Sequence, residues 1–188
     1  GQWRGRKLQF PCIDGLRPTS DRIRETLFNW LAGDIHQAHC LDLCAGSGAL
    51  GFEAVSRGAG AAVLLETQSA AAAALKAHCQ LLGTGAVRVL QQDALRYLQQ
   101  GPLETFNLVF LDPPFAANLW QDLTLALVAR PWLADNALIY IEAPLNQPLQ
   151  LPASLQLIKD KKAGQVAYRL YRYTFDLCDS TDTQSPAP

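Results

Sequence analysis

From residue 39 onward, short apolar runs alternate with amphipathic segments, and this alternation limits the possible folds more than any other feature. The apolar runs have the length of strands, and the segments between them have helical periodicity. Strands that alternate with helices form right-handed crossover units, which place the strands parallel in one sheet. We expect five strands, over 40–44, 62–66, 87–90, 106–112 and 137–142, separated by helices over 49–57, 69–82, 94–100 and 119–129.

The pattern changes after Pro144. Segments 155–161 and 166–175 both resemble strands, and the four residues from Lys162 to Gln165 separate them. Such a short connection predicts an antiparallel hairpin rather than another crossover. Residues 20–32 predict a helix with one apolar face ahead of the first strand. The expected fold is therefore α/β, with a seven-stranded, mostly parallel sheet, helices on both faces and a C-terminal antiparallel hairpin.

The length of 188 residues suits one domain. We expect that domain over 1–175: a basic arm and lid helix (1–32), a cofactor-binding core (39–143) and a closing hairpin (154–175). The polar tail 176–188 is expected to be disordered. Five scattered cysteines without paired ligand spacing predict free thiols in a reducing compartment. Because no signal peptide or membrane-length apolar run is visible, we expect a cytoplasmic protein.

The chain contains no methionine, so we expect the natural protein to begin before Gly1.

Charge is unevenly distributed, although the net charge is only −1. Residues 1–24 carry six basic and two acidic side chains, and residues 159–172 carry five basic side chains and one acidic. Two basic segments around an acidic body are typical of proteins that bind polyanions. Two solvated charged faces would produce the same pattern, so the charge alone leaves both interpretations open.

A glycine-rich loop, DLCAGSGALG over 42–51, leaves the first expected strand and opens a helix. Gly46, Gly48 and Gly51 satisfy G-x-G-x-x-G, and Glu66 follows Gly46 by 20 residues. This spacing is the dinucleotide fingerprint with its acidic ribose partner. The loop by itself is therefore compatible with NAD.

Acidic residues at successive strand ends favour a different cofactor. Asp42 lies inside the first strand, where it would repel a pyrophosphate but would suit the amino group of S-adenosylmethionine. Asp93, after the third strand, could accept a hydrogen bond from an adenine amine. An alternative is that these acids only cap the helices that follow them.

The fourth strand ends in Asp112-Pro113-Pro114-Phe115. Ligands of open α/β sheets bind outside the carboxyl ends of the strands. The prolines remove two backbone donors, which leaves carboxylate and carbonyl acceptors for a planar amine, and Phe115 could stack on the ring that carries it. Hydride transfer has no use for such a motif. An ordinary proline turn is the alternative interpretation.

In this order the motifs resemble those of class I S-adenosylmethionine-dependent methyltransferases, in the subgroup that methylates exocyclic or amide nitrogens. Residues 3–8 (WRGRKL), 17–31 (RPTSDRIRETLFNWL) and 163–171 (AGQVAYRLY) resemble the bacterial 16S ribosomal RNA guanine-N2 methyltransferases. The resemblance covers about residues 1–175. It implies a Rossmann-like fold, S-adenosylmethionine as cofactor, and the N2 amine of one guanine in 16S RNA as the methyl acceptor. The expected partner is the nascent or partly assembled small subunit.

The expected site has three groups of residues. The catalytic group is Asp112, Pro113, Pro114 and Phe115. The cofactor group is Asp42, Ala45, Gly46, Ser47, Gly48, Glu66, Asp93 and Ala94, with Asp42 at the amino group, Glu66 at the ribose and Asp93 at the adenine. The RNA group is Arg4, Arg6, Lys7, Arg17, Thr19, Arg22, Arg24, Lys159, Lys161 and Lys162.

We expect no metal, no membrane contact and a monomer. The nearest alternative function is methylation of another nitrogen, in DNA adenine, cytosine or a protein glutamine. An NAD-dependent oxidoreductase and a non-catalytic RNA-binding module are more distant alternatives.

Overall fold

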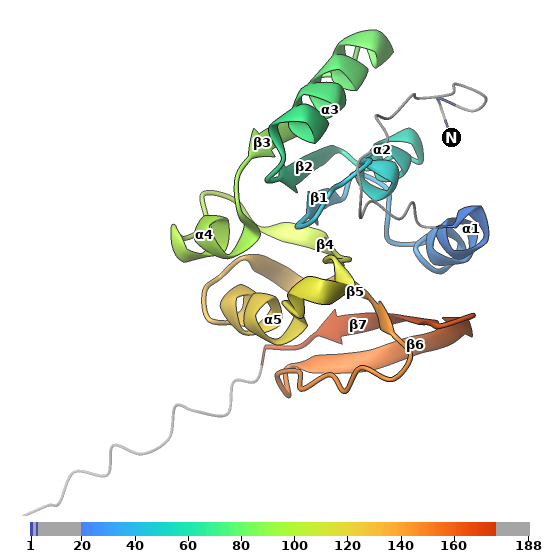
Figure 1. The fold of residues 1–188 in the computed structure, drawn as a ribbon, viewed down its shortest axis with the longest axis vertical. Helices are drawn as coiled ribbons and strands as arrows, with labels where there is room; N and C mark the ends of the chain where they lie inside the picture. The colour runs from blue at the N-terminus through green and yellow to red at the C-terminus, as the bar shows by residue number, and fades with distance from the viewer. Residues whose placement is uncertain (2, 4–19, 176–188) are drawn as a thin grey trace, which may run out of the picture.

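The computed structural model describes residues 1, 3 and 20–175 (Figure 1). Its centre is a seven-stranded sheet with the order β3-β2-β1-β4-β5-β7-β6. The strands are β1 (His39–Asp42), β2 (Ala61–Glu66), β3 (Val87–Gln91), β4 (Phe106–Leu111), β5 (Leu133–Pro144), β6 (Leu155–Ala163) and β7 (Val166–Tyr173). The first five strands are parallel, and β7 runs antiparallel to both β5 and β6. The predicted fold class is confirmed.

Helices cover both faces of the sheet (Figure 1). One face packs against α1 (Asp21–Trp30), α2 (Ala49–Ser56) and α3 (Ser69–Leu82), and the other packs against α4 (Ala94–Gln99) and α5 (Trp120–Val128). The chain runs from β1 outward to β3 and then crosses back to β4 on the other side of β1. A crevice forms at such a reversal, between the carboxyl ends of β1 and β4. Among the described residues, no helix combines the length and apolarity needed to cross a membrane.

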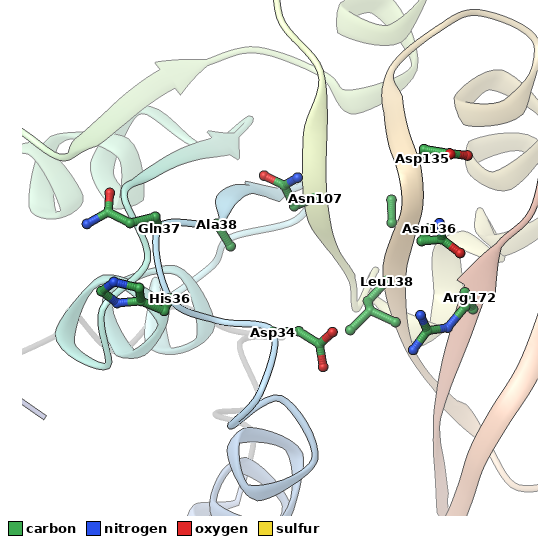
Figure 2. A pocket seen from close by; sticks show the side chains of 10 residues that line it. Asp34, His36, Gln37, Ala38, Asn107, Asp135, Asn136, Leu138 and Arg172 are labelled. Carbon is green, nitrogen blue, oxygen red and sulfur yellow. The ribbon is translucent and has the colours of Figure 1, made fainter.

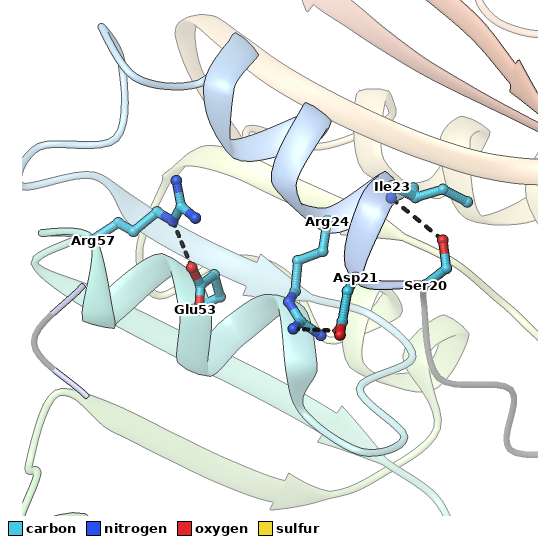
Figure 3. A network of polar contacts seen from close by, with 6 residues as sticks. All are labelled: Ser20, Asp21, Ile23, Arg24, Glu53 and Arg57. Carbon is cyan, nitrogen blue, oxygen red and sulfur yellow. Dashed lines mark hydrogen bonds and ion pairs between the residues drawn. The ribbon is translucent and has the colours of Figure 1, made fainter. Parts of the chain in front are cut away.

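The helix α1 is a flank of the sheet. Ser20 caps it by accepting a hydrogen bond from the Ile23 N–H at 3.3 Å, and Arg24 pairs with Asp21 at 2.7 Å (Figure 3). The Trp30 ring stacks on Tyr168 of β7 at a centroid distance of 5.4 Å.

The neighbouring helix α2 is tied to α1 through one arginine. Arg57 follows α2, pairs with Glu53 at 2.5 Å (Figure 3) and lies over the Phe28 ring of α1 at 5.1 Å. Phe28 in turn contacts Phe110 of β4 at a centroid distance of 6.1 Å. These contacts fix α1 and α2 over the centre of the sheet, at the strands that carry the candidate site.

Several element boundaries differ from the sequence prediction. The strand β5 begins at Leu133 instead of residue 137, because its first residue pairs with Phe106 ahead of a register shift. The strand β6 extends to Ala163, so the hairpin turn is only Gly164 and Gln165, with Gly164 at φ 59°. A two-residue turn with positive φ matches the twist of antiparallel strands. Lys162 therefore belongs to β6, and the predicted four-residue connection was wrong.

Candidate active site

The strand register brings acidic residues together at the carboxyl edge of the sheet. Asp42 of β1 pairs with Leu64 of β2 and Phe110 of β4. Cys44, Glu66 and Asp112 each lie two residues further along these strands. Hydrogen bonds beyond the paired residues, such as Leu43 N–H to the Phe110 carbonyl at 3.1 Å, continue the alignment. Because side chains alternate along a strand, Glu66 and Asp112 face the side covered by α1 and α2. Cys44 follows the end of β1 and packs against the hydrophobic cluster on the α4 and α5 side.

Cys44 lies at the centre of this group. Burial raises the pKa of its thiol, and the carboxylates of Asp42, Asp112, Glu66 and Asp93 raise it further, in that order of effect. All four predicted strand-end acids are therefore close enough to act electrostatically on one sulfur atom. The raised pKa keeps the thiol protonated, so Cys44 is a poor nucleophile.

The glycine loop is shaped by two different constraints. Gly46 and Gly48 have φ values of 51° and 73°, a conformation that favours glycine. Gly51 lies inside α2, where an added Cβ would stand 2.6 Å from Leu64 Cδ1. The first two glycines turn the chain, and the third lets α2 approach β2 closely. Ala45 and Ser47 lie within the same loop, and the Ala45 carbonyl accepts a hydrogen bond from the Gly48 N–H at 2.6 Å.

The Asp42 side chain binds the backbone of this loop. The residue is 2% exposed. Burial raises the pKa of its carboxyl to about 7, hydrogen bonds from the Cys44 and Gly51 N–H groups lower it, and the Glu66 charge raises it. A carboxylate that binds both ends of the loop organises the loop itself. Its predicted contact with a cofactor amino group stays a prediction.

Glu66 and Asp93 also bind backbone amides. Glu66 accepts hydrogen bonds from the Gly46 N–H at 3.0 Å and the Gln68 N–H at 2.8 Å, so it joins the glycine loop to the turn after β2. Asp93 caps α4 by accepting from the Arg96 N–H at 2.9 Å. The helix-capping alternative therefore holds for Asp93. The neighbouring Ala94, predicted to pack on an adenine, is buried at the start of α4.

The Asp-Pro-Pro-Phe motif directly follows β4. Asp112 is half-buried, Pro113 is buried and Pro114 is exposed. Phe115 begins a short 3-10 turn (Phe115–Ala117), and its half-buried ring lies 6.1 Å from the Trp120 ring at an angle of 46°. One side of Phe115 therefore packs against α5. A cavity of about 340 Å³ adjoins this turn, between Asn118 and Trp120 on one side and residues 147–150 on the other.

Sequence reasoning missed one acidic residue, Glu142 of β5. It is level with Asp112, because Leu111 of β4 pairs with Ile141 of β5. Glu142 is 6% exposed and accepts a hydrogen bond from the Tyr140 hydroxyl at 2.9 Å. The signal was the same as for the other acids, a carboxylate near the end of an apolar strand. Glu142 is the last residue of the predicted fifth strand, and it was not assigned to the site.

The predicted RNA-binding residues fall into three sets. Arg4, Arg6, Lys7, Arg17 and Thr19 lie outside the described residues. Arg22 is exposed on α1, and Arg24 is engaged by Asp21. On the edge strand β6, Lys159 and Lys161 pair with Leu170 and Tyr168, which pack on the α1 face, whereas Lys162 pairs with Ala167 and points to the opposite face.

A second cavity, of about 270 Å³, lies at the opposite edge of the sheet (Figure 2). Asp34, His36, Asn107 and Arg172 are among its lining residues. Asn107 lies near the start of β4 and Arg172 near the end of the antiparallel β7, so this cavity opens at the amino ends of the parallel strands. None of the four strand-end acids, Asp42, Glu66, Asp93 and Asp112, lines this cavity.

The side chains at the carboxyl edge of the sheet limit which ligands can bind there. In residues 1, 3 and 20–175, no group of three or more His, Cys, Asp or Glu side chains is arranged to hold a metal ion. Four carboxylates at the carboxyl edge of the sheet disfavour a pyrophosphate and favour a cationic ligand with amine or hydroxyl donors. The arrangement fits S-adenosylmethionine better than a dinucleotide.

A protein-family model and several individual proteins of known sequence match this chain. The family described as conserved hypothetical protein 95 matches residues 1–172. The Ribosomal RNA small subunit methyltransferase D of Escherichia coli strain K12 is 50% identical over 173 residues, which cover 92% of this chain and 87% of that protein. The protein of the same name from Haemophilus influenzae is 47% identical over 175 residues, covering 92% and 91%.

Solved structures agree with this comparison. The structure of yhhF from Escherichia coli has a TM-score of 0.85 at 49% identity and covers 93% of this chain and 95% of that chain. TrmN from Thermus thermophilus has a TM-score of 0.66 at 19% identity, covering 81% and 48%, and is similar in fold alone.

Proposed function

The chain belongs to the conserved hypothetical protein 95 family, and from this membership we propose that it is an S-adenosylmethionine-dependent methyltransferase that acts on small-subunit ribosomal RNA. The relatives with 50% and 47% identity are both named Ribosomal RNA small subunit methyltransferase D. We further propose that the acceptor is the exocyclic N2 amine of one guanine. The observation that carries the proposal is that Asp42 and Glu66 bind the backbone of the glycine loop, while Asp93 and the Asp112 of Asp-Pro-Pro-Phe lie close enough to act electrostatically on Cys44 of the same loop.

The cofactor would lie over β1, β2 and β3. In the proposed arrangement the Gly46 to Gly48 backbone passes under the methionine part, Glu66 accepts from the ribose hydroxyls and Asp93 from the adenine amine. Asp42 supports the loop and contributes negative charge near the amino group. When bound, S-adenosylmethionine supplies a methyl group on a sulfonium, which becomes a neutral thioether once the amine has taken the methyl.

The protein has to activate a weak nucleophile, because the guanine N2 lone pair is delocalised into the ring. The Asp112 carboxylate and the Pro113 carbonyl accept the two amine hydrogens and orient the nitrogen toward the cofactor. Asp112 also stabilises the positive charge that develops on N2 until a proton leaves. Phe115 stacks on the base after the base has left its own stack, and stacking of this kind is worth about 1–3 kcal/mol.

The test is methylation of defined pools with labelled S-adenosylmethionine. Small subunits, large subunits, DNA and protein are incubated separately, and the product is identified by mass spectrometry of nucleosides or peptides. We expect N2-methylguanosine in small-subunit RNA. N6-methyladenosine, methylated protein or no incorporation would each contradict the proposal.

A matched pair of variants tests the catalytic residue. Asp112→Ala should lower turnover at least about 100-fold while S-adenosylmethionine still binds in calorimetry, because the lost interaction forms with the amine in the transition state. Asp122→Ala is the control, since Asp122 is exposed on α5. Near-normal turnover of the Asp112 variant would show that Asp112 is not a catalytic residue.

A further inference from the structure

The strand register puts a second carboxylate beside Asp112. Phe110 pairs with Tyr140 and Leu111 with Ile141, so Glu142 is the next residue level with Asp112 on the neighbouring strand. Tyr140 packs on the α1 face, and Glu142, two residues later, faces the same side. Neighbouring strands are about 4.8 Å apart. Asp112 and Glu142 are therefore adjacent acids on one face of one edge.

Tyr140 contacts one of these acids, and the charges of both affect its phenol. Its hydroxyl donates to Glu142 Oε2 at 2.9 Å. Burial raises the pKa of the Tyr140 phenol, and the charges of Glu142 and Asp112 raise it further. The phenol is completely buried, so its position is fixed by packing. It holds the Glu142 carboxylate in one orientation beside Asp112.

One contact of residue 142 does not depend on its side chain. The Trp120 indole N–H donates to the Glu142 backbone carbonyl at 2.8 Å, a bond that any residue at this position would accept. Burial of a carboxylate next to another carboxylate costs free energy through lost hydration and like-charge repulsion, and donors such as the Tyr140 hydroxyl offset part of this cost. Acids kept in such surroundings are concentrated at functional sites.

The order of the strands indicates what Glu142 would meet. The residues assigned to the cofactor lie on the β1, β2 and β3 side of β4, and Asp112 at the end of β4 holds the reacting amine. The rest of the base must then extend to the other side of β4, over β5 and β7. Glu142 is the first side chain there at the level of Asp112, followed by Tyr168, its partner on β7.

We propose that Glu142 determines base specificity by accepting the N1–H of the target guanine, and that Tyr140 is a positioning residue for this carboxylate. The inference rests on the proposed guanine-N2 function and deepens it. Guanine carries two kinds of donor side by side, the N1–H and the N2 amine. Adenine carries an acceptor at N1 beside its amine, and that lone pair would face the Glu142 carboxylate. Enzymes that extrude a base read it by hydrogen bonds to this edge.

The test uses 2-aminopurine, which keeps the 2-amine but has an unprotonated N1. It replaces the mapped target guanine in a small-subunit RNA assembled by ligation, and initial methylation rates are compared with the guanine substrate. The wild-type protein should prefer guanine at least about 10-fold, since one specific base contact discriminates by roughly that factor or more. In Glu142→Gln the amide can donate to N1, so the preference should fall about 10-fold.

Two further variants separate reading of the base from structural damage. Tyr140→Phe should weaken the preference for guanine, because the carboxylate loses the donor that orients it. Glu104→Gln makes the same chemical change at a surface glutamate paired with Arg88 and should leave the preference unchanged. S-adenosylmethionine affinity is measured for every variant, and it should not change.

The outcomes distinguish the two proposals. If the wild-type protein methylates 2-aminopurine as fast as guanine, the role of Glu142 is refuted without any variant. A wild-type preference that Glu142→Gln retains in full refutes it as well. If the natural product is not N2-methylguanosine, the guanine-N2 function fails first, and the role of Glu142 fails with it.

Discussion

Burial of Asp42 should make the stability of the protein depend on pH in a predictable direction. Its carboxyl has a folded pKa of about 7, raised from 3.8 mainly by burial. The folded state therefore binds a proton more tightly than the unfolded state. The contribution of Asp42 to the free energy of unfolding is therefore at its maximum below pH 4. It is lost as the pH rises toward and through 7, because the carboxyl group ionises more readily in the unfolded chain than in the folded protein.

The expected size follows from the pKa difference. Each pKa unit corresponds to about 1.4 kcal/mol, so a shift of about 3 units lowers the free energy of unfolding by about 4 kcal/mol once both states are ionised. Between pH 5 and pH 8 the loss is about 2–3 kcal/mol, since part of it has already occurred below pH 5. Asp42→Asn stays neutral, and its oxygen can still accept from the Cys44 or Gly51 N–H group.

The measurement is urea unfolding of wild type and Asp42→Asn at four pH values from 5 to 8. Other groups titrate equally in both proteins, so the difference between the two isolates Asp42. We expect this difference to shift by about 2–3 kcal/mol in favour of the variant as the pH rises. Asp122→Asn, a change at an exposed aspartate, is the control. A wild-type minus variant difference that stays constant within about 0.5 kcal/mol from pH 5 to 8 would refute the reasoning.

Three more predictions concern packing, stacking and charge. Gly51→Ala places a methyl group 2.6 Å from Leu64 Cδ1 and should lower the free energy of unfolding by about 1–3 kcal/mol, whereas Gly33→Ala, with no atom within 4 Å of the new Cβ, should change it by less than about 0.5 kcal/mol. Phe115→Ala should raise KM for RNA roughly 5- to 150-fold with unchanged S-adenosylmethionine affinity; an unchanged KM would show that the ring only packs against α5. Lys161→Ala should reduce the slope of log Kd against log salt by about 0.7–0.9, and equal slopes would exclude Lys161 from the RNA contact.

Local sequence patterns were enough to predict the fold class, because alternation of short apolar runs with helical segments leaves few connections that satisfy handedness. The short link before β7 was enough to predict the hairpin. The early start of β5 at Leu133 could not be read in the same way. It depends on pairing of Leu133 with Phe106 across a register shift, which is a long-range contact with no local signature.

The gathering of acidic residues at the carboxyl edge of the sheet was predictable from the sequence, and their hydrogen bonds were not. A carboxylate at a strand end can bind a ligand, cap the next helix or hold a loop, and spacing does not distinguish these uses. Asp93 caps α4, and Asp42 binds the Cys44 and Gly51 amides. Glu142 was missed for a related reason. Its position level with Asp112 follows from the pairing of β4 with β5, and the sequence does not encode that register visibly.

The strand order also explains why the reaction would occur at β4 and at no other strand. The residues proposed to bind the cofactor lie at or after the ends of β1, β2 and β3. Lys159 and Lys161, which are proposed to bind RNA, lie beyond β5 on the edge strand β6. Only β4 borders both halves, because the chain crosses back beside β1 after completing β3. A group at the end of β4 can therefore touch a methyl donor on one side and a base on the other. Moving the Asp-Pro-Pro-Phe motif to the end of β5 would separate the acceptor from the donor by one further strand, about 4.8 Å, and direct transfer would no longer be possible.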